Sequence, residues 1–183
     1  MEQNIELRMA TLEDAEHILG IYAPYCRDTV ITFEYEVPTL EEFQGRMKNI
    51  MEKYPYIVAL QDEKIVGYAY ASAYRTRAAY QWDVESSIYV DRNCTASGVG
   101  TALYARLLEL LKKQNIRNVY ACVTLPNEAS ERIHAKFGFA YAGMLHRAGY
   151  KAGEWQNVGW FEKHLEYEGE IPEPVRWIHE IVE

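Results

Sequence analysis

The sequence predicts a mixed α/β domain of the α+β kind, in which strands first meander and then alternate with helices. From residue 56 onward, runs rich in Ile, Val, Tyr and Ala are separated by short polar turns, as in paired strands. From Gly98 to about Gln114, leucines recur every three or four residues, which is the period of a helix. Strand-like runs flank that helix, so we expect β-α-β units with a crossover helix.

The order of the elements follows from local signals. Two helices are expected to begin at Thr11 and Thr39, because each threonine has an acidic residue three positions later, the pattern of a helix cap. Pro24 is expected to end the first of these helices. The expected strands lie at about 5–9, 56–60, 64–74, 80–90, 119–124, 139–145 and 155–165, and the helices at about 11–24, 39–53, 98–114 and 127–136.

One domain over residues 1–166 and an extended C-terminal tail over residues 167–183 are expected. The last stretch is acidic and carries two prolines, with a final turn expected around Trp177. The chain of 183 residues is long enough to bury a sizeable core in a single domain.

The composition argues against several classes of protein. The net charge is −8, with 19 basic and 27 acidic residues, so a general phosphate-binding surface for nucleic acid is not expected. No apolar run approaches the roughly 20 residues that span a bilayer, and the first residues do not form a secretory signal. The three cysteines form no CxxC pair, so neither a disulfide framework nor a zinc site is expected. These features predict a cytoplasmic, metal-free domain.

The junction between a strand and the long helix has the form of an anion site. The strand ends at Val90, a loop follows, and Gly98-Val99-Gly100-Thr101 opens the helix. Unpaired backbone N–H groups and the helix dipole favour negative charge there, and glycine lets a ligand approach the backbone. The pattern is neither a Walker loop nor a complete GxGxxG fingerprint. Two glycines before a helix also suit a turn without a ligand, so the context decides.

That context resembles the GNAT acetyltransferase superfamily. Pro126-Asn127 and Phe137-Gly138-Phe139 follow the loop at the family's spacing. The likeness narrows to the phosphinothricin acetyltransferase branch over roughly residues 5–165. The matching segments are Thr32-Phe33-Glu34, Tyr54-Pro55-Tyr56, Gly67-Tyr68-Ala69-Tyr70, Arg75-Thr76-Arg77-Ala78-Ala79-Tyr80, Val84-Glu85-Ser86-Ser87-Ile88-Tyr89-Val90, Ile133-His134 and Ala148-Gly149-Tyr150-Lys151-Ala152-Gly153-Glu154-Trp155.

The resemblance implies a GNAT fold, acetyl-CoA as the acetyl donor, a small-molecule amine as the acceptor and a homodimer. It implies that the loop holds the coenzyme pyrophosphate and that the preceding strand pairs with the pantetheine arm. The implied coenzyme-binding residues are Ile88, Tyr89, Val90, Ala96, Ser97, Gly98, Val99, Gly100, Thr101 and Asn127. Thr95 and Ser97 stand where the family usually has Gln or Arg and a basic residue, which removes charge-assisted phosphate contacts. Arg92 is a candidate to replace them. Asn127 also suits a helix N-cap.

Two residues are candidates for acid–base catalysis. Glu85 is a carboxylate in a strand of apolar and small residues, and the branch places its proposed base there. An outward-facing strand residue is the alternative that alternation leaves open. His134 lies four residues before Gly138, where many superfamily members carry a tyrosine that protonates the thiolate. Its imidazole could act as acid or base near neutrality, although a lone histidine on a short helix is more often structural.

Arg75 and Arg77 are candidates for binding the acceptor. In an extended segment their spacing of two places them on one side, where they could hold a carboxylate and a second oxyacid group. A solvated loop pair is the alternative. Phe33 and Tyr80 could wall the pocket or belong to the core. A backbone N–H near residues 88–90 is expected to polarise the thioester carbonyl.

Two other functions fit the same sequence. One is a protein or peptide N-acetyltransferase, which would suit an open groove lined with carboxylates. The other is a non-catalytic acyl-CoA-binding module, suggested by Thr95 and Ser97. The arginine pair favours a small acidic acceptor, and the presence of Glu85 and His134 favours catalysis.

Overall fold

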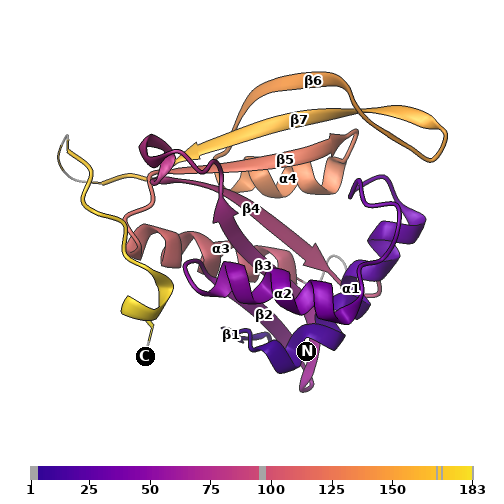
Figure 1. Ribbon diagram of the computed structural model, residues 1–183, viewed down its shortest axis with the longest axis horizontal. Coiled ribbons are helices and arrows are strands. Elements are labelled where there is room, and N and C mark those ends of the chain that lie inside the picture. The colour runs from indigo at the N-terminus through magenta and orange to yellow at the C-terminus, as the bar shows by residue number, and fades with distance from the viewer. Residues whose placement is uncertain (1–3, 95–97, 168, 170, 183) are drawn as a thin grey trace.

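The computed structural model describes residues 4–94, 98–167, 169 and 171–182. These residues form one seven-stranded mixed sheet with helices on both faces, as the sequence predicts (Figure 1). The strands are β1 Glu6–Met9, β2 Tyr56–Gln61, β3 Lys64–Ala73, β4 Asp83–Val90, β5 Asn118–Leu125, β6 Ala140–Lys151 and β7 Glu154–His164. The α-helices are α1 Ala15–Asp28, α2 Leu40–Met51, α3 Val99–Lys113 and α4 Glu128–Lys136, and 3-10 turns lie at Leu12–Asp14, Ala78–Tyr80 and Ile178–Glu180.

At the centre of the sheet, two parallel strands pair over only part of their length. The strand order is β1-β2-β3-β4-β5-β7-β6, and β4 and β5 are parallel because α3 connects them as a crossover helix. They pair only between Asp83–Glu85 and Asn118–Tyr120. Beyond that short ladder the two strands diverge (Figure 1), although β4 stays paired with β3 and β5 with β7 along their lengths. The sheet therefore opens at its centre.

The two faces of the sheet carry separate cores. On one face, leucines of α3 such as Leu103 and Leu107 pack on Ala69 and Val84, and Ile133 of α4 packs against the same cluster. On the other face, helices α1 and α2 pack on Tyr56, Val58 and Tyr68. Alternation along each strand assigns its side chains to these faces, because neighbouring residues point in opposite directions.

Three expected boundaries are wrong. Pro24 does not end α1, which continues to Asp28. Burial of Cys26 on the helix's apolar face offsets the N–H that proline cannot donate. Strand β4 begins at Asp83 rather than near residue 80, because Ala78–Tyr80 forms a 3-10 turn. Strand β6 extends to Lys151, and irregular register within it obscures the alternation that marks a strand.

The described part of the C-terminal segment packs on the domain. Ile178 is 4% exposed, and the Trp177 ring meets Tyr54 edge-on with centroids 6.1 Å apart. The buried Gln114 side chain donates from Nε2 to the backbone oxygens of Lys53 and Arg176, both at 2.7 Å. Among the described residues, no helix is both long and apolar enough to cross a membrane.

Candidate active site

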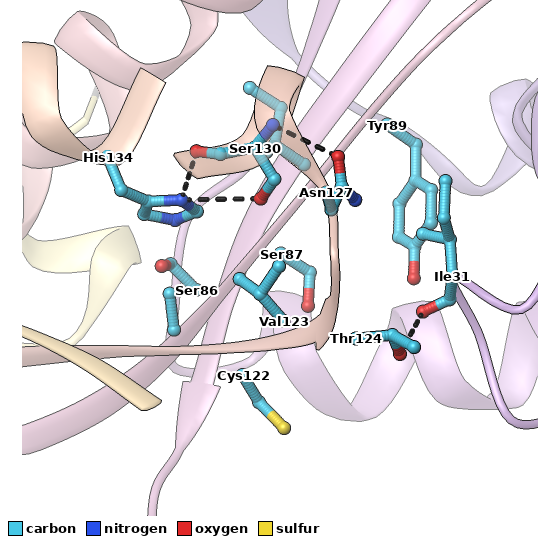
Figure 2. A pocket seen from close by; sticks show the side chains of 12 residues that line it. Ile31, Ser86, Ser87, Tyr89, Cys122, Val123, Thr124, Asn127, Ser130 and His134 are labelled. Carbon is cyan, nitrogen blue, oxygen red and sulfur yellow. Dashed lines mark hydrogen bonds between the residues drawn. The ribbon is translucent and has the colours of Figure 1, made fainter. Parts of the chain in front are cut away.

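An open groove lies where β4 and β5 diverge (Figure 2). Ser86 and Ile88 line it from the face covered by α3, and Ser87 and Tyr89 line it from the face covered by α1. Because successive residues of one strand point to opposite faces, the groove passes through the sheet. Its lining is completed by Ile31, Ala121, Cys122, Val123, Thr124, Asn127, Ser130 and His134.

Backbone groups of β4 face this groove. The Asp91 N–H donates to the Val66 oxygen at 2.8 Å, and the Tyr74 N–H donates to the Asp83 oxygen at 3.2 Å. Since paired residues of antiparallel strands alternate in bonding, the odd-numbered residues of β4 bond to β3 and the even-numbered ones point toward β5. The diverging end of β5 leaves the N–H groups of Ile88 and Val90 pointing away from β3 into the gap, and Ile88 lines the groove. The register thus distinguishes them from Tyr89, which the sequence could not do.

The first turn of α3 begins at a glycine in the left-handed region. Gly98 has φ +85° and is the N-cap of α3, so the N–H groups that follow it have no partner within the helix. At Gly100 an added Cβ would lie 3.2 Å from the Ile133 side chain, so α4 packs closely against this turn. Val99 is buried there. Thr95, Ala96 and Ser97, which were expected to complete the phosphate loop, lie outside the described residues.

A cation that the sequence reasoning missed lies at this helix terminus. Lys136, in the last turn of α4, donates from Nζ to Thr101 Oγ1 at 3.3 Å. Arg92, the expected replacement for a basic loop residue, forms an ion pair with Asp28 at 3.3 Å. No sequence signal ties Lys136 to the loop, because the contact depends on how α4 packs on α3.

Glu85 is the last residue of β4 that pairs with β5, and it lies next to the groove without being one of its lining residues. By alternation with Tyr89, its side chain lies on the face covered by α1 and α2. Burial raises the pKa of its carboxyl group above the usual range, and the positive charge of Arg75 opposes that rise. The nearby Cys122 thiol is partly desolvated, and together with Glu85 this raises its pKa to about 11. Cys122 is therefore a neutral thiol at neutral pH, whereas Glu85 is suited to accept a proton.

His134 approaches the groove from the other face of the sheet. Its side chain is 3% exposed, and Nδ1 lies 2.7 Å from the Ser130 carbonyl oxygen (Figure 2). A carbonyl only accepts, so Nδ1 carries the hydrogen and Nε2 holds the lone pair. Burial lowers the pKa of His134, and its ring stacks on Phe161 with centroids 5.5 Å apart. At neutral pH the imidazole is neutral and is suited to act as an acceptor or base rather than as an acid.

Hydroxyl and amide groups complete this side of the groove. Asn127 Oδ1 accepts from the Ser130 N–H at 3.1 Å and so caps α4, while the residue also lines the groove. Ser86, which sequence reasoning did not select, shares a 2.8 Å hydrogen bond with the buried hydroxyl of Tyr104 on α3. The sequence feature that could have identified Ser86 is its hydroxyl group on an otherwise apolar face of β4.

The residues expected to bind the acceptor substrate lie in two separate parts of the structure. The Arg75 guanidinium lies over the Tyr74 ring at 4.9 Å, and Tyr80 meets that ring edge-on at 5.9 Å. Arg77 is exposed at the start of the Ala78–Tyr80 turn, so both arginines belong to one short segment beside β4. Phe33 packs instead on Gly149 of β6, where an added Cβ would overlap its ring.

The described residues contain no group of three or more His, Cys, Asp or Glu side chains able to hold a metal ion.

The chain matches the acetyltransferase (GNAT) domain family over residues 7–160, which includes every described element of the site. The chain belongs to the GNAT acetyltransferase family. It is therefore an N-acetyltransferase, and its relatives place it in the phosphinothricin acetyltransferase-like branch.

Two of those relatives and one solved structure define the likeness. The phosphinothricin N-acetyltransferase of Streptomyces viridochromogenes is 34% identical over 97% of this chain and 96% of its own length. The L-methionine sulfoximine/L-methionine sulfone acetyltransferase of Pseudomonas paraeruginosa is 26% identical over 87% of this chain and 94% of its own. The crystal structure of a phosphinothricin acetyltransferase from Sinorhizobium meliloti with acetyl-CoA has a TM-score of 0.88 at 30% identity, covering 97% of this chain and 99% of that one.

Proposed function

We propose that this GNAT enzyme transfers an acetyl group directly from acetyl-CoA to the primary amine of a small amino-acid-like acid. Phosphinothricin, methionine sulfoximine and methionine sulfone are the acceptors that the names of its relatives suggest. The observation that carries the proposal is the groove through the sheet. It begins just beyond Glu85, the last residue of β4 that pairs with β5, and beyond that pair the N–H groups of Ile88 and Val90 have no strand partner among the described residues.

The chain's own residues supply the donor side of this reaction. The N–H groups of the first turn of α3, with Lys136 beside them, suit a pyrophosphate. The diverging edge of β4 offers amide partners to an extended arm that carries peptide groups. Bound acetyl-CoA supplies the activated thioester. The N–H of Ile88 or Val90 is placed to polarise a carbonyl lying in the groove.

Glu85 supplies the base. It takes a proton from the acceptor ammonium, and the freed amine then attacks the thioester carbonyl carbon. As the C–N bond forms and the C–S bond breaks, the sulfur leaves with the electron pair and takes up the second proton that the attacking nitrogen releases. The raised pKa of Glu85 improves its match to an ammonium donor. The neutral imidazole of His134 contributes an acceptor on the opposite face, which is the role we propose for it.

The segment of Arg75 and Arg77 supplies the positive charge for an acidic acceptor. The guanidinium of Arg75, which lies over the Tyr74 ring, is close enough to Glu85 to lower the pKa of that carboxyl group. An amino acid could therefore place its amine near Glu85 and its acidic groups near the arginines. A peptide acceptor would need an open groove on this face. Lys151 and Tyr35 instead tie the segment after α1 to β6, which favours a small acceptor.

We also propose that two copies of the chain form a homodimer. Strand β6 is an edge strand, and the β6–β7 hairpin exposes large apolar side chains that would suit an interface between copies. These side chains are Tyr141, Met144, Leu145, Tyr150 and Trp155.

Release of coenzyme A thiol in the presence of a panel of acceptors tests the proposal. We expect turnover with phosphinothricin, methionine sulfoximine or methionine sulfone, and none with short peptides. The Arg77→Ala variant should raise the KM of the acceptor by roughly tenfold or more and change that of acetyl-CoA by less than about twofold. Arg106→Ala, on α3, is the matched control. Peptides as the preferred acceptors, or equal effects on both Michaelis constants, would contradict the proposal.

A further inference from the structure

The distal end of the β6–β7 hairpin is tied to the opposite half of the sheet by a buried lysine. Lys151 is the last residue of β6, and its Nζ donates to the Cys26 carbonyl at 2.8 Å and the Thr32 carbonyl at 2.7 Å. Cys26 lies in the last turns of α1, and Thr32 lies in the loop that follows. In Figure 1 this loop rises from α1 beside the end of the hairpin.

The burial of Lys151 is costly, which argues against an incidental contact. Its side chain is 6% exposed, and the acceptors of its two hydrogen bonds are carbonyl oxygens rather than carboxylates. Removing an ammonium group from water costs several kcal/mol, and neutral carbonyls return only part of this. Because the side chain is sealed from solvent, it does not contact a substrate. Its function is therefore to hold the two segments together.

Further contacts fix the same loop. The Tyr22 hydroxyl is 2.8 Å from Thr32 Oγ1 and 2.7 Å from Glu34 Oε2, and Arg46 forms an ion pair with Glu34 at 2.6 Å. The Phe33 ring covers Gly149 of β6, and the Tyr35 hydroxyl donates to the Tyr150 carbonyl oxygen. Residues 31–35 are thus held between α1 and α2 on one side and β6 on the other.

These contacts span the opening in the sheet. Helix α1 packs on β3 and β4, whereas β6 pairs with β7 and, through it, with β5. Ile31 of the held loop lines the groove, and its carbonyl oxygen is 3.4 Å from Thr124 Oγ1 of β5 (Figure 2). The paired residues of β4 and β5 close one end of the gap, and the bonds of Lys151 to Cys26 and Thr32 bridge the other.

We propose that Lys151 is a positioning residue whose bonds to Cys26 and Thr32 form a clamp across the open end of the groove. The clamp holds residues 31–34 as the wall against which the acceptor binds. This inference rests on the proposed function, since it assigns a part of the acceptor site. It concerns the placement of the wall and not the chemical step.

The Lys151→Met variant tests the clamp, because methionine has a similar length and lacks the N–H donors. Lys163→Met, which removes a lysine from β7 of the same hairpin, is the matched control. For the Lys151→Met variant we expect the KM of phosphinothricin to rise by about tenfold or more. The dissociation constant of coenzyme A, measured by calorimetry, should change by less than about threefold. The control should match the wild type in both.

Hydrogen exchange separates the clamp from the proposed function. Amides of residues 29–36 should exchange faster in Lys151→Met than in Lys163→Met, while amides of α3 stay protected. If Lys151→Met does not fold, Tyr22→Phe removes the hydroxyl that bonds Thr32 and should show the same local increase. Unchanged exchange in this loop would overturn the clamp whatever the acceptor is. Faster exchange with an unchanged acceptor KM would overturn its role in the site. A wild-type enzyme that acetylates no small acceptor would contradict the proposed function alone.

Discussion

Glu85 illustrates how an environment, rather than a motif, prepares a residue for its role. Its strand position was visible in the sequence, but alternation allowed it to face either way. The structure places it at the last position where β4 pairs with β5, where burial raises its pKa and Arg75 limits the rise. The sequence could name the residue and could not give the sign of either effect, because both depend on neighbours brought together by folding.

The opposing effects of burial and Arg75 lead to a pH prediction. In the proposed mechanism Glu85 can act as a base only when it is deprotonated, so turnover should fall as the pH falls through its pKa. Arg75 lowers that pKa, and its removal therefore raises it. In the Arg75→Met variant, the acid limb of the kcat–pH profile should move to higher pH.

Profiles measured at saturating acceptor check this shift. Arg77→Met is the matched control, since it removes a charge from the same segment. An acid limb that stays in place, or that moves to lower pH, in the Arg75→Met variant would contradict the assignment of Glu85 as the base.

His134, Lys136 and Ser86 show where reasoning from residues stops. The sequence identified His134 but left acid and base equally open, and the Ser130 carbonyl decides the tautomer. Lys136 reaches Thr101 across two helices, and Ser86 meets Tyr104 across the strand and helix. These contacts follow from packing, for which a single sequence has no periodic signal.

At the scale of elements, periodicity located the strands and helices well and placed their ends less reliably. Helix α1 passes through Pro24 because apolar positions continue beyond it. Strand β6 has 12 residues and continues to Lys151, beyond the expected end at residue 145, since its irregular register breaks the alternation on which the expectation rested. The hairpin from β2 to β3 was predicted correctly, because two runs rich in Ile, Val, Tyr and Ala are separated by a short polar turn.

The C-terminal segment gives a prediction at this scale. Ile178 is 4% exposed and packs against the core shared by α3 and the sheet. Ile178→Ala should lower the free energy of unfolding by about 2–5 kcal/mol, through lost burial and the cavity left behind.

Urea unfolding of matched variants measures this loss. Ile171, in the same segment, is 84% exposed, and Ile171→Ala should change the free energy by less than about 0.5 kcal/mol. Equal effects of the two substitutions would contradict the docking of the segment.

At the scale of the whole molecule, the site exists because the parallel strands β4 and β5 separate. The sequence predicted the crossover helix between them, which sets the parallel direction. It could not predict where pairing stops, because β-propensity depends on the neighbouring strands, which a single sequence does not show. The gap places Glu85 and His134 on opposite faces of one sheet while a single groove serves both sides.

The central claim of the proposed function is that Glu85, at the last β4–β5 pair beside this groove, takes the proton that frees the amine for acetyl transfer. The most direct test measures thiol release from acetyl-CoA with phosphinothricin by the wild type, Glu85→Gln and the control Glu41→Gln on α2. We expect the wild type and the control to turn over alike, and kcat to fall by roughly 10²–10⁴-fold in Glu85→Gln with folding and coenzyme binding retained. Turnover by Glu85→Gln within about threefold of the wild type would contradict the account.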